Sequence, residues 1–231
     1  MARTRMFDWL TRRREPRPGD TLATRLRAYP PYEAPHAGPG TALSPAQAAE
    51  NLAYFEQVLP QRLQQVSALL HEVAGIDTRA ALADPSAHAA ALADELQRWA
   101  LAQWPALPAE GGLARWLDSR RSGDDIVFSM LLDLAILLGE LIRRGNPDWR
   151  WGLDRDAKNL ADGMPSARRI VLLADPVGTH TTPFVLDVED LVVHRFQHAD
   201  DPAQRLLNPL RRLVEEGLRG DAMAYWHDTA R

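Results

Sequence analysis

The stretch Ile126-Val-Phe-Ser-Met-Leu-Leu-Asp-Leu-Ala-Ile-Leu-Leu-Gly-Glu-Leu-Ile142 is the most apolar part of the chain and decides the fold. It is shorter than the roughly 20 residues that a membrane-spanning helix needs. It also contains Asp133 and Glu140, and the hydrocarbon core of a bilayer tolerates carboxylates poorly. We therefore predict a buried helix that is capped by Asp124 and continues to Arg144.

The polar residues of this helix follow one narrow stripe at helical spacing. In one interpretation the stripe pairs within the molecule, with Glu140 bound to Arg144 one turn later. In the other, Asp133 and Glu140 are buried carboxylates with raised pKa values that act as acid and base. Seven residues correspond to about 10 Å along a helix, whereas two carboxylates that serve one bond lie about 5–9.5 Å apart. We keep Asp133 and Glu140 as candidate binding residues.

Helical signals also fill the region on the N-terminal side of this stretch. Apolar residues recur there every three or four positions, and Ser-Pro or Asp-Pro pairs mark helix starts. A proline inside a helix kinks or splits it. We predict helices from Ser44-Pro45 to Gly75 with a kink or break at Pro60, from Asp84-Pro85 to just before Pro105, and around Leu113–Leu117.

The C-terminal side is mixed, with short runs of branched apolar residues between turn signals. Residues 148–153, 169–174 and 183–186 are predicted strands, and helices follow from Asp187 to His198 and from Asn208-Pro209 to Leu218. The fold class is therefore α+β and predominantly helical, with a helical N-terminal half packed against a small C-terminal sheet that helices flank. We predict one globular domain over 44–231, helical in 44–144 and mixed in 145–231.

Residues 1–43 are predicted to be a basic arm followed by an extended segment rich in proline and glycine. Tyr29 and Tyr32 could pin this segment across the domain. The arm, residues 1–17, has a net charge of +4 against −4 for the whole chain, which leaves −8 for the remainder. An acidic body argues against a nucleic-acid partner, while the arm could touch an anionic membrane weakly.

Composition and motifs argue against several classes of enzyme. The chain has no cysteine, which excludes disulfides, cysteine zinc sites and a cysteine nucleophile, and fits the cytoplasm. It contains no Gly-x-Gly-x-x-Gly, phosphate-loop or Gly-x-Ser-x-Gly motif and nothing that looks like a signal peptide. An abundance of alanine and arginine beside a single lysine, Lys158, is typical of a GC-rich bacterial genome. We expect a cytoplasmic bacterial protein without a cofactor.

Three histidines and two tryptophans are the other candidates. On a helix, His194 and His198 share a face and could hold a metal ion. Arg195, however, occupies the position where the metalloprotease motif has glutamate. The alternative is that both histidines are ordinary surface residues in contact with water. His180 lies in the turn after the second strand, a frequent place for functional residues. Trp149 and Trp151 share one side of the first strand, where they are either core residues or anchors for a partner.

The order of elements over 126–220 resembles that of small bacterial proteins that accompany toxins, some of them immunity proteins. The resemblance rests on Leu138-Gly139-Glu140-Leu141-Ile142, which leads into a tryptophan-rich strand, a second strand and two helices. It implies binding to a toxin or effector and assigns no residue a role.

The predicted function is therefore a non-enzymatic, cytoplasmic protein-binding module, with toxin neutralisation as its most concrete form. An acidic surface would steer it toward a basic partner. Two alternatives remain open. One is an enzyme or metal-binding protein with a site near His180, His194 and His198. The other is an adaptor or structural component whose first 43 residues order on binding.

Overall fold

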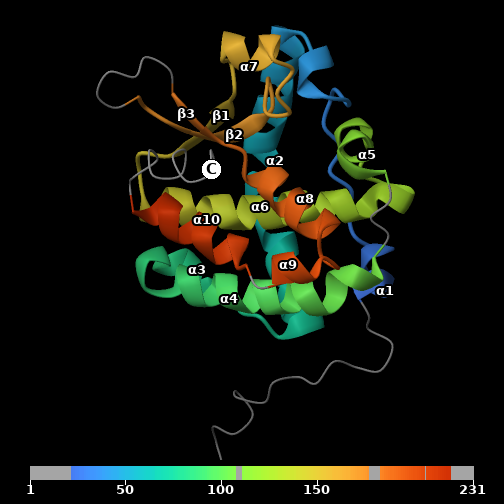
Figure 1. Cartoon of the computed structure of the whole chain (residues 1–231), viewed down its shortest axis with the longest axis vertical. Coiled ribbons are helices and arrows are strands. Elements are labelled where there is room, and N and C mark those ends of the chain that lie inside the picture. The colour runs from blue at the N-terminus through green and yellow to red at the C-terminus, as the bar shows by residue number, and fades with distance from the viewer. Residues whose placement is uncertain (1–21, 108–110, 177–182, 206, 220–231) are drawn as a thin grey trace, which may run out of the picture.

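The computed structural model describes residues 22–107, 111–176, 183–205 and 207–219, and helix α6 (Ile126–Gly145) forms its centre (Figure 1). Every side chain of α6 from Val127 to Ile142 is buried. The predicted central helix is thus confirmed. Its start differs, because Asp125, not Asp124, is at the cap position and makes no capping bond. The carboxylate of Asp125 instead accepts a bond of 2.7 Å from Arg115 Nε.

Helix α2 (Pro45–Ala74) crosses behind α6 (Figure 1). Ser44 caps it together with Gln47, and Gly75 ends it in the left-handed conformation with a φ of 66°. Of the predicted kink or break at Pro60, the break is wrong, since the helix continues through this residue, and the kink stays a prediction. Pro60 faces solvent, while Phe55 and Leu63 on either side are buried. Packing on both sides therefore offsets the hydrogen bond that proline cannot make.

Further helices surround α6, and α4, α8 and α10 each contact it. Asp84, Asp187 and Asn208 cap these three helices through their side chains, as their positions in the sequence indicate. In the described residues, the helices other than α2 and α6 are α1 (Leu22–Leu26), α3 (Arg79–Ala83), α4 (Pro85–Gln103), α5 (Gly112–Asp118), α7 (Ala157–Ala161), α8 (Val188–Gln197), α9 (Pro202–Arg205) and α10 (Pro209–Leu218), with 3-10 turns at Gly40–Ala42, Trp104–Ala106 and Gly123–Asp125.

An antiparallel sheet lies at one end of α6 in the order β1 (Arg150–Leu153), β2 (Ile170–Ala174), β3 (Phe184–Leu186). The three predicted strands are present, and the predominantly helical α+β class is confirmed. Trp151 of β1 packs on Gly139 of α6, where an added β carbon would lie 2.3 Å from the indole ring. Glycine at this position lets the sheet approach the central helix closely.

Residues 27–43, which we call the strap, run along the body beside α2 and α6 (Figure 1). Tyr29 and Tyr32 are both buried and hold the strap, as the sequence suggested. The prediction of an extended segment within residues 1–43 is wrong for Leu22–Leu26, which contains neither proline nor glycine and forms α1. The basic arm lies outside the described residues.

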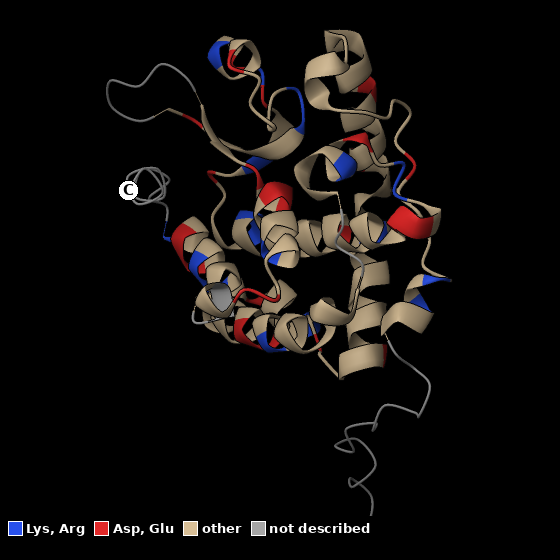
Figure 2. Ribbon diagram, turned by 45° about the vertical axis from the view of Figure 1, so that its right-hand side comes forward, with Lys and Arg blue, Asp and Glu red and all other residues tan. Residues whose placement is uncertain are grey.

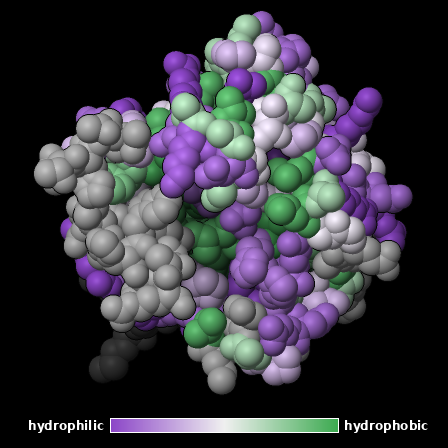
Figure 3. Space-filling view, turned by 45° about the horizontal axis from the view of Figure 1, so that its top comes forward, coloured by the Kyte–Doolittle hydropathy of each residue, from purple (hydrophilic) through white to green (hydrophobic). Residues whose placement is uncertain are grey.

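Positions of basic and acidic residues are interspersed along the outer helices (Figure 2). On the face shown in Figure 3, hydrophilic groups surround smaller apolar areas. Among the described residues three large apolar side chains are exposed: Leu113, Met164 and Leu207. In the part of the chain that the structure describes, no helix combines the length and apolar character needed to cross a bilayer.

Candidate functional site

A pocket of about 590 Å³ opens between the strap, the connection from α5 to α6, and the start of β2. Four arginines line it: Arg120, Arg121, Arg168 and Arg169. They form two Arg-Arg pairs in the sequence: Arg120 and Arg121 before α6, and Arg168 and Arg169 before β2. The pocket thus brings together two Arg-Arg pairs that are separated by almost fifty residues.

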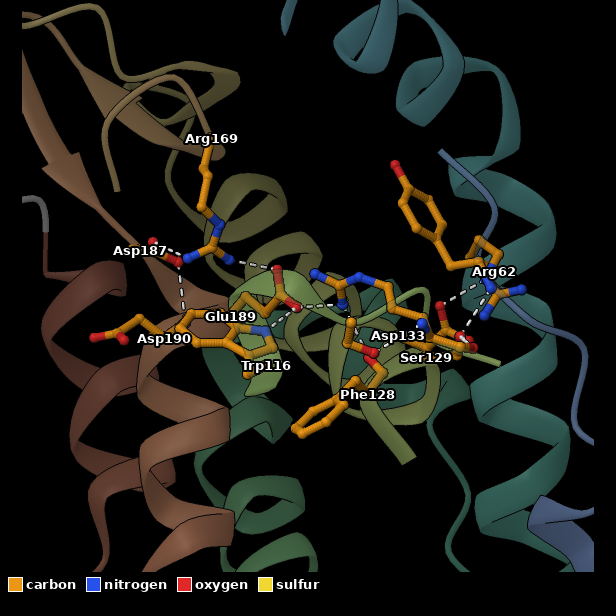
Figure 4. Close-up of polar contacts among 12 residues, drawn as sticks. Arg62, Trp116, Phe128, Ser129, Asp133, Arg169, Asp187, Glu189 and Asp190 are labelled. Carbon is orange, nitrogen blue, oxygen red and sulfur yellow. Dashed lines mark hydrogen bonds and ion pairs between the residues drawn. The ribbon is translucent and has the colours of Figure 1, made fainter. Parts of the chain in front are cut away.

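The inner arginine of each pair binds the same carboxylate, that of Glu189 on α8. Arg169 Nη2 lies 2.6 Å from Glu189 Oε2, while Arg121 Nη1 donates to Oε1. The indole of Trp116 also donates to Oε1, at 2.9 Å, and Arg169 Nη1 lies 3.0 Å from Asp187 Oδ2. Figure 4 shows Glu189 between Arg169 and Trp116. We call these five residues the Glu189 cluster.

The charges of the Glu189 cluster are buried and balanced. Burial alone would raise the pKa of Glu189, but Arg121 and Arg169 outweigh it and lower this pKa to about 2. For Asp187 burial dominates, and it raises the pKa to about 6 despite Arg169. The guanidinium of Arg169 also lies over the Trp116 ring, 4.1 Å from its centroid. Ion pairs within the Glu189 cluster therefore hold Arg121 and Arg169 in place at the pocket.

The outer arginines, Arg120 and Arg168, have no such partner. Arg120 is exposed, and Arg168 is half-buried and donates from Nη1 to the carbonyl of Leu43. Neither forms an ion pair with any residue that the structure describes. Two guanidinium groups on the pocket wall thus have no ion-pair partner among the described residues, although the lining also includes the carboxylate of Glu33.

Backbone strain coincides with the two Arg-Arg pairs. Within the described residues, Arg121 and Arg168 are the non-glycine residues with positive φ, 56° and 58°. This conformation costs about 1–3 kcal/mol and persists only where surrounding contacts impose it. At Arg121, the Ser129 hydroxyl donates to the carbonyl at 2.7 Å. At Arg168, the amide donates to the Asp154 carbonyl at 2.8 Å.

Asp133, a predicted binding residue, lies in a second buried cluster that anchors the strap. Its carboxylate accepts bonds from Arg62 Nε at 2.7 Å and from the Tyr29 hydroxyl at 2.5 Å. Arg62 Nη1 also donates to the carbonyls of Pro30 and Pro31 (Figure 4 shows the pair of Arg62 and Asp133). Burial raises the pKa of Asp133 to about 6, against the lowering effect of Arg62.

Glu140 is bound elsewhere on α6, so the two carboxylates do not share a site. Arg143 Nε lies 2.8 Å from Glu140 Oε1 and Arg144 Nε lies 3.2 Å from Oε2, which confirms the predicted pairing one turn away. Trp151 Nε1 donates to Oε1 at 3.0 Å. Burial alone would raise the pKa of Glu140, but these partners hold it below its usual value. Asp133 and Glu140 both lie outside the lining of the pocket.

Of the two candidate tryptophans, Trp149 is buried and Trp151 is half-buried. Trp149 is 4% exposed, precedes β1, and donates from Nε1 to the carbonyl of Gly217 at 3.1 Å. Trp151 packs edge-on against Phe55, with ring centroids 5.1 Å apart. The burial of Trp149 matches the core interpretation, and a role of either tryptophan as an anchor for a partner stays a prediction.

Two of the three candidate histidines, His194 and His198, lie side by side. The rings of His194 and His198 lie 4.4 Å apart at the end of α8, and burial together with His198 lowers the pKa of His194. Among the described residues no group of three or more histidine, aspartate or glutamate side chains is arranged to hold a metal ion. His180 lies outside the described residues. The predicted metal site at His194 and His198 therefore has two candidate ligands and no third in the described part of the chain.

The four pocket arginines are the residues that sequence reasoning missed. Arg-Arg is a common dipeptide in this chain, since 26 of its 27 basic residues are arginine. What distinguishes two of these pairs is the shared partner Glu189, which only the fold brings near. A guanidinium keeps its proton, so this arrangement can bind carboxylate or phosphate but cannot act as an acid or base. Comparisons with family models, with curated proteins and with solved structures found no match to this chain.

Proposed function

We propose that this chain is a binding protein whose pocket holds the anionic group of a small organic molecule. The observation that carries the proposal is the pair of outer arginines, Arg120 and Arg168, which line the pocket without a carboxylate partner among the described residues. Arg168 is half-buried, and a half-buried guanidinium without a counter-charge is costly, so an anionic ligand would supply that charge.

The size and the rigidity of the pocket support a small ligand. Sites for small molecules and cofactors have volumes of about 300–1,000 Å³ and combine apolar walls with a few placed polar groups. This pocket, at about 590 Å³, includes Leu117, Leu132 and Ile170 beside the arginines. Because the Glu189 cluster fixes the two inner arginines before any ligand arrives, this part of the pocket loses little ordering entropy on binding.

A protein partner, including a toxin, stays a prediction from the sequence. The large exposed apolar side chains of the described residues are scattered over α5, the β1–β2 connection and the segment before α10. Stable protein interfaces usually centre on a contiguous patch with aromatic or arginine anchors. The concave, arginine-lined pocket favours a small anion over a flat protein surface.

Isothermal titration with benzoate and phenyl phosphate at low salt tests the proposal. We expect wild-type protein to bind at least one of them, and the double variant Arg120→Gln/Arg168→Gln to lose at least about tenfold in affinity, since charge-assisted hydrogen bonds are worth about 1.5–3 kcal/mol. The matched control is Arg98→Gln, an exposed arginine of α4 outside the pocket, which should bind like wild type. Equal affinity in the double variant, or no binding by wild type, would overturn the proposal.

A further inference from the structure

We infer that the ligand of this pocket is a hydroxycarboxylic acid whose hydroxyl group donates to the ring of His36, a residue of the strap that lines the pocket. This inference rests on the proposed function and names the class of anion that the same pocket selects. The arginines attract any anion, whereas His36 distinguishes one that carries a hydroxyl group from one that does not.

Three hydrogen bonds to α2 hold His36 in place. Its backbone amide donates to Asn51 Oδ1 at 2.9 Å, and its carbonyl accepts from Asn51 Nδ2 at 2.8 Å. Asn51 is only 8% exposed, so a buried side chain holds the backbone of His36. The ring Nε2 of His36 lies 2.6 Å from Glu50 Oε2. Both the main chain and the imidazole are therefore held before a ligand arrives.

The contact with Glu50 determines the role that remains for the other ring nitrogen. A carboxylate can only accept, so Nε2 carries the proton and Nδ1 of the neutral imidazole is an acceptor. Within the described structure Nδ1 has no hydrogen-bond partner, and it is not sealed from solvent. A ligand hydroxyl group supplies the donor that this acceptor lacks, and a methyl ether does not.

Other side-chain acceptors of the lining are already used. Both polar atoms of the Asn51 amide bind the strap, and Glu189 binds the inner arginines. Ser119 Oγ accepts a bond of 2.8 Å from a backbone amide. The hydroxyl of Tyr32 is buried away from the pocket space and from water. His36 is therefore the fixed lining side chain with an open acceptor.

Glu33 and Ser122 also line the pocket, but both are exposed and no described bond fixes either side chain. Glu33 enters the charge balance as well. With Arg120 and Arg168 it is a lining charge without an ion pair among the described residues, and the three together leave a charge of +1. One carboxylate balances this charge, whereas a phosphate ester carries about −1.5 to −2 at pH 7.

Hydroxybenzoates and their methyl ethers form matched probes, because the members of a pair have the same charge and differ in one hydrogen-bond donor. We use the 3- and the 4-substituted pairs, which place the donor at two distances from the carboxylate. In titration calorimetry at pH 8, which favours the neutral imidazole, we expect at least one hydroxybenzoate to bind wild-type protein at least about threefold more tightly than its methyl ether and than benzoate.

His36→Gln separates recognition of the hydroxyl group from attachment of the strap. Glutamine reaches the position of Nε2 and can still bind Glu50, but it has no acceptor in place of Nδ1. We expect this variant to bind benzoate within about twofold of wild type and to lose the preference for the hydroxybenzoate. Glu33→Gln, which removes the exposed carboxylate of the strap, is the matched control and should keep the preference.

The outcomes distinguish this inference from the proposed function. Equal binding of each hydroxybenzoate and its methyl ether would overturn the inference and leave the anion-binding proposal standing. So would a preference that survives in His36→Gln or disappears in Glu33→Gln, or binding of phenyl phosphate when every benzoate fails to bind. Failure of all these anions, phenyl phosphate included, to bind wild-type protein would overturn both.

Discussion

Glu189 accepts bonds from side chains of three segments that are distant in the sequence: Trp116 of α5, Arg121 before α6, and Arg169 at the start of β2. Its side chain is only 7% exposed, so the two guanidinium groups depend on it for neutralisation away from water. A buried ion pair gains little over apolar packing, but a buried charge left without its partner is strongly destabilising. This residue therefore affects both the stability of the fold and the shape of the pocket.

Replacing Glu189 with glutamine tests this role. Glu189→Gln keeps the size of the side chain and removes its charge, which leaves Arg169 paired with Asp187 but Arg121 without an ion-pair partner among the described residues. We expect the free energy of unfolding at pH 7 to fall by about 3–5 kcal/mol, as measured by urea unfolding. The control is Asp175→Asn, which breaks an exposed pair with Arg150 and should cost less than about 1 kcal/mol. Similar losses in the two variants would contradict this account.

At the scale of elements, the strap forms one wall of the pocket and is attached to both Arg-Arg pairs. Its Tyr32 amide donates to Ser129 Oγ at 2.8 Å, and the same hydroxyl donates to the carbonyl of Arg121. At its other end, the Leu43 carbonyl accepts the bond from Arg168. The strap therefore connects the two sides of the pocket.

Gly40→Ala tests the close contact between the strap and the β1–β2 connection. A β carbon at Gly40 would lie 2.1 Å from the Ala167 carbonyl oxygen, so the strap must move away. We expect the variant to lose about 1–3 kcal/mol of stability and to bind benzoate or phenyl phosphate more weakly, although no charge changes. Thr41→Ala, at an exposed neighbouring position, should leave both unchanged. Calorimetric melting and ligand titration give the two readouts, and unaltered affinity in Gly40→Ala would show that the strap does not shape the site.

The elements could be predicted from the sequence because their signals are local. Apolar spacing, Ser44 and Gly75 at the ends of α2, and Asp187 at the start of α8 all act within one helical turn. The pocket could not be predicted in this way. Arg121 and Arg169 meet through Glu189, at separations of 68 and 20 residues, and no spacing rule connects them. The failure at Pro60 has a similar cause, since tertiary packing decided whether that helix continued.

For the whole molecule, buried carboxylates make stability depend on pH in two opposite directions. Asp133 and Asp187 have pKa values raised by burial to about 6, from an ordinary 3.8, so they contribute stability at low pH that is lost as pH rises through 6. Glu189, with a pKa lowered to about 2, contributes stability that is lost as pH falls below its ordinary 4.5. The two effects together favour a maximum of stability between these ranges, near about pH 4.

Asp187→Asn tests the upper part of this pH dependence. Asparagine caps a helix as well as aspartate does, so the bond from the Asp190 amide should survive while the titrating group is removed. Wild-type protein should lose stability between pH 4.5 and pH 7, with Asp187 contributing about 2 kcal/mol of the loss. The variant should lose less, as followed by urea unfolding at each pH. If the free energy of unfolding changed with pH in the same way in both proteins, the result would contradict the raised pKa of Asp187.

The most direct test of the central claim is a crystal structure of the protein grown or soaked with benzoate at saturating concentration. The account predicts the carboxylate in the pocket of about 590 Å³, with oxygens at about 2.7–2.9 Å from guanidinium nitrogens of Arg120, Arg168 or both. It also predicts that the Glu189 cluster keeps the bonds described above. An occupied pocket in which the carboxylate contacts neither arginine, or a ligand bound only elsewhere, would contradict the claim.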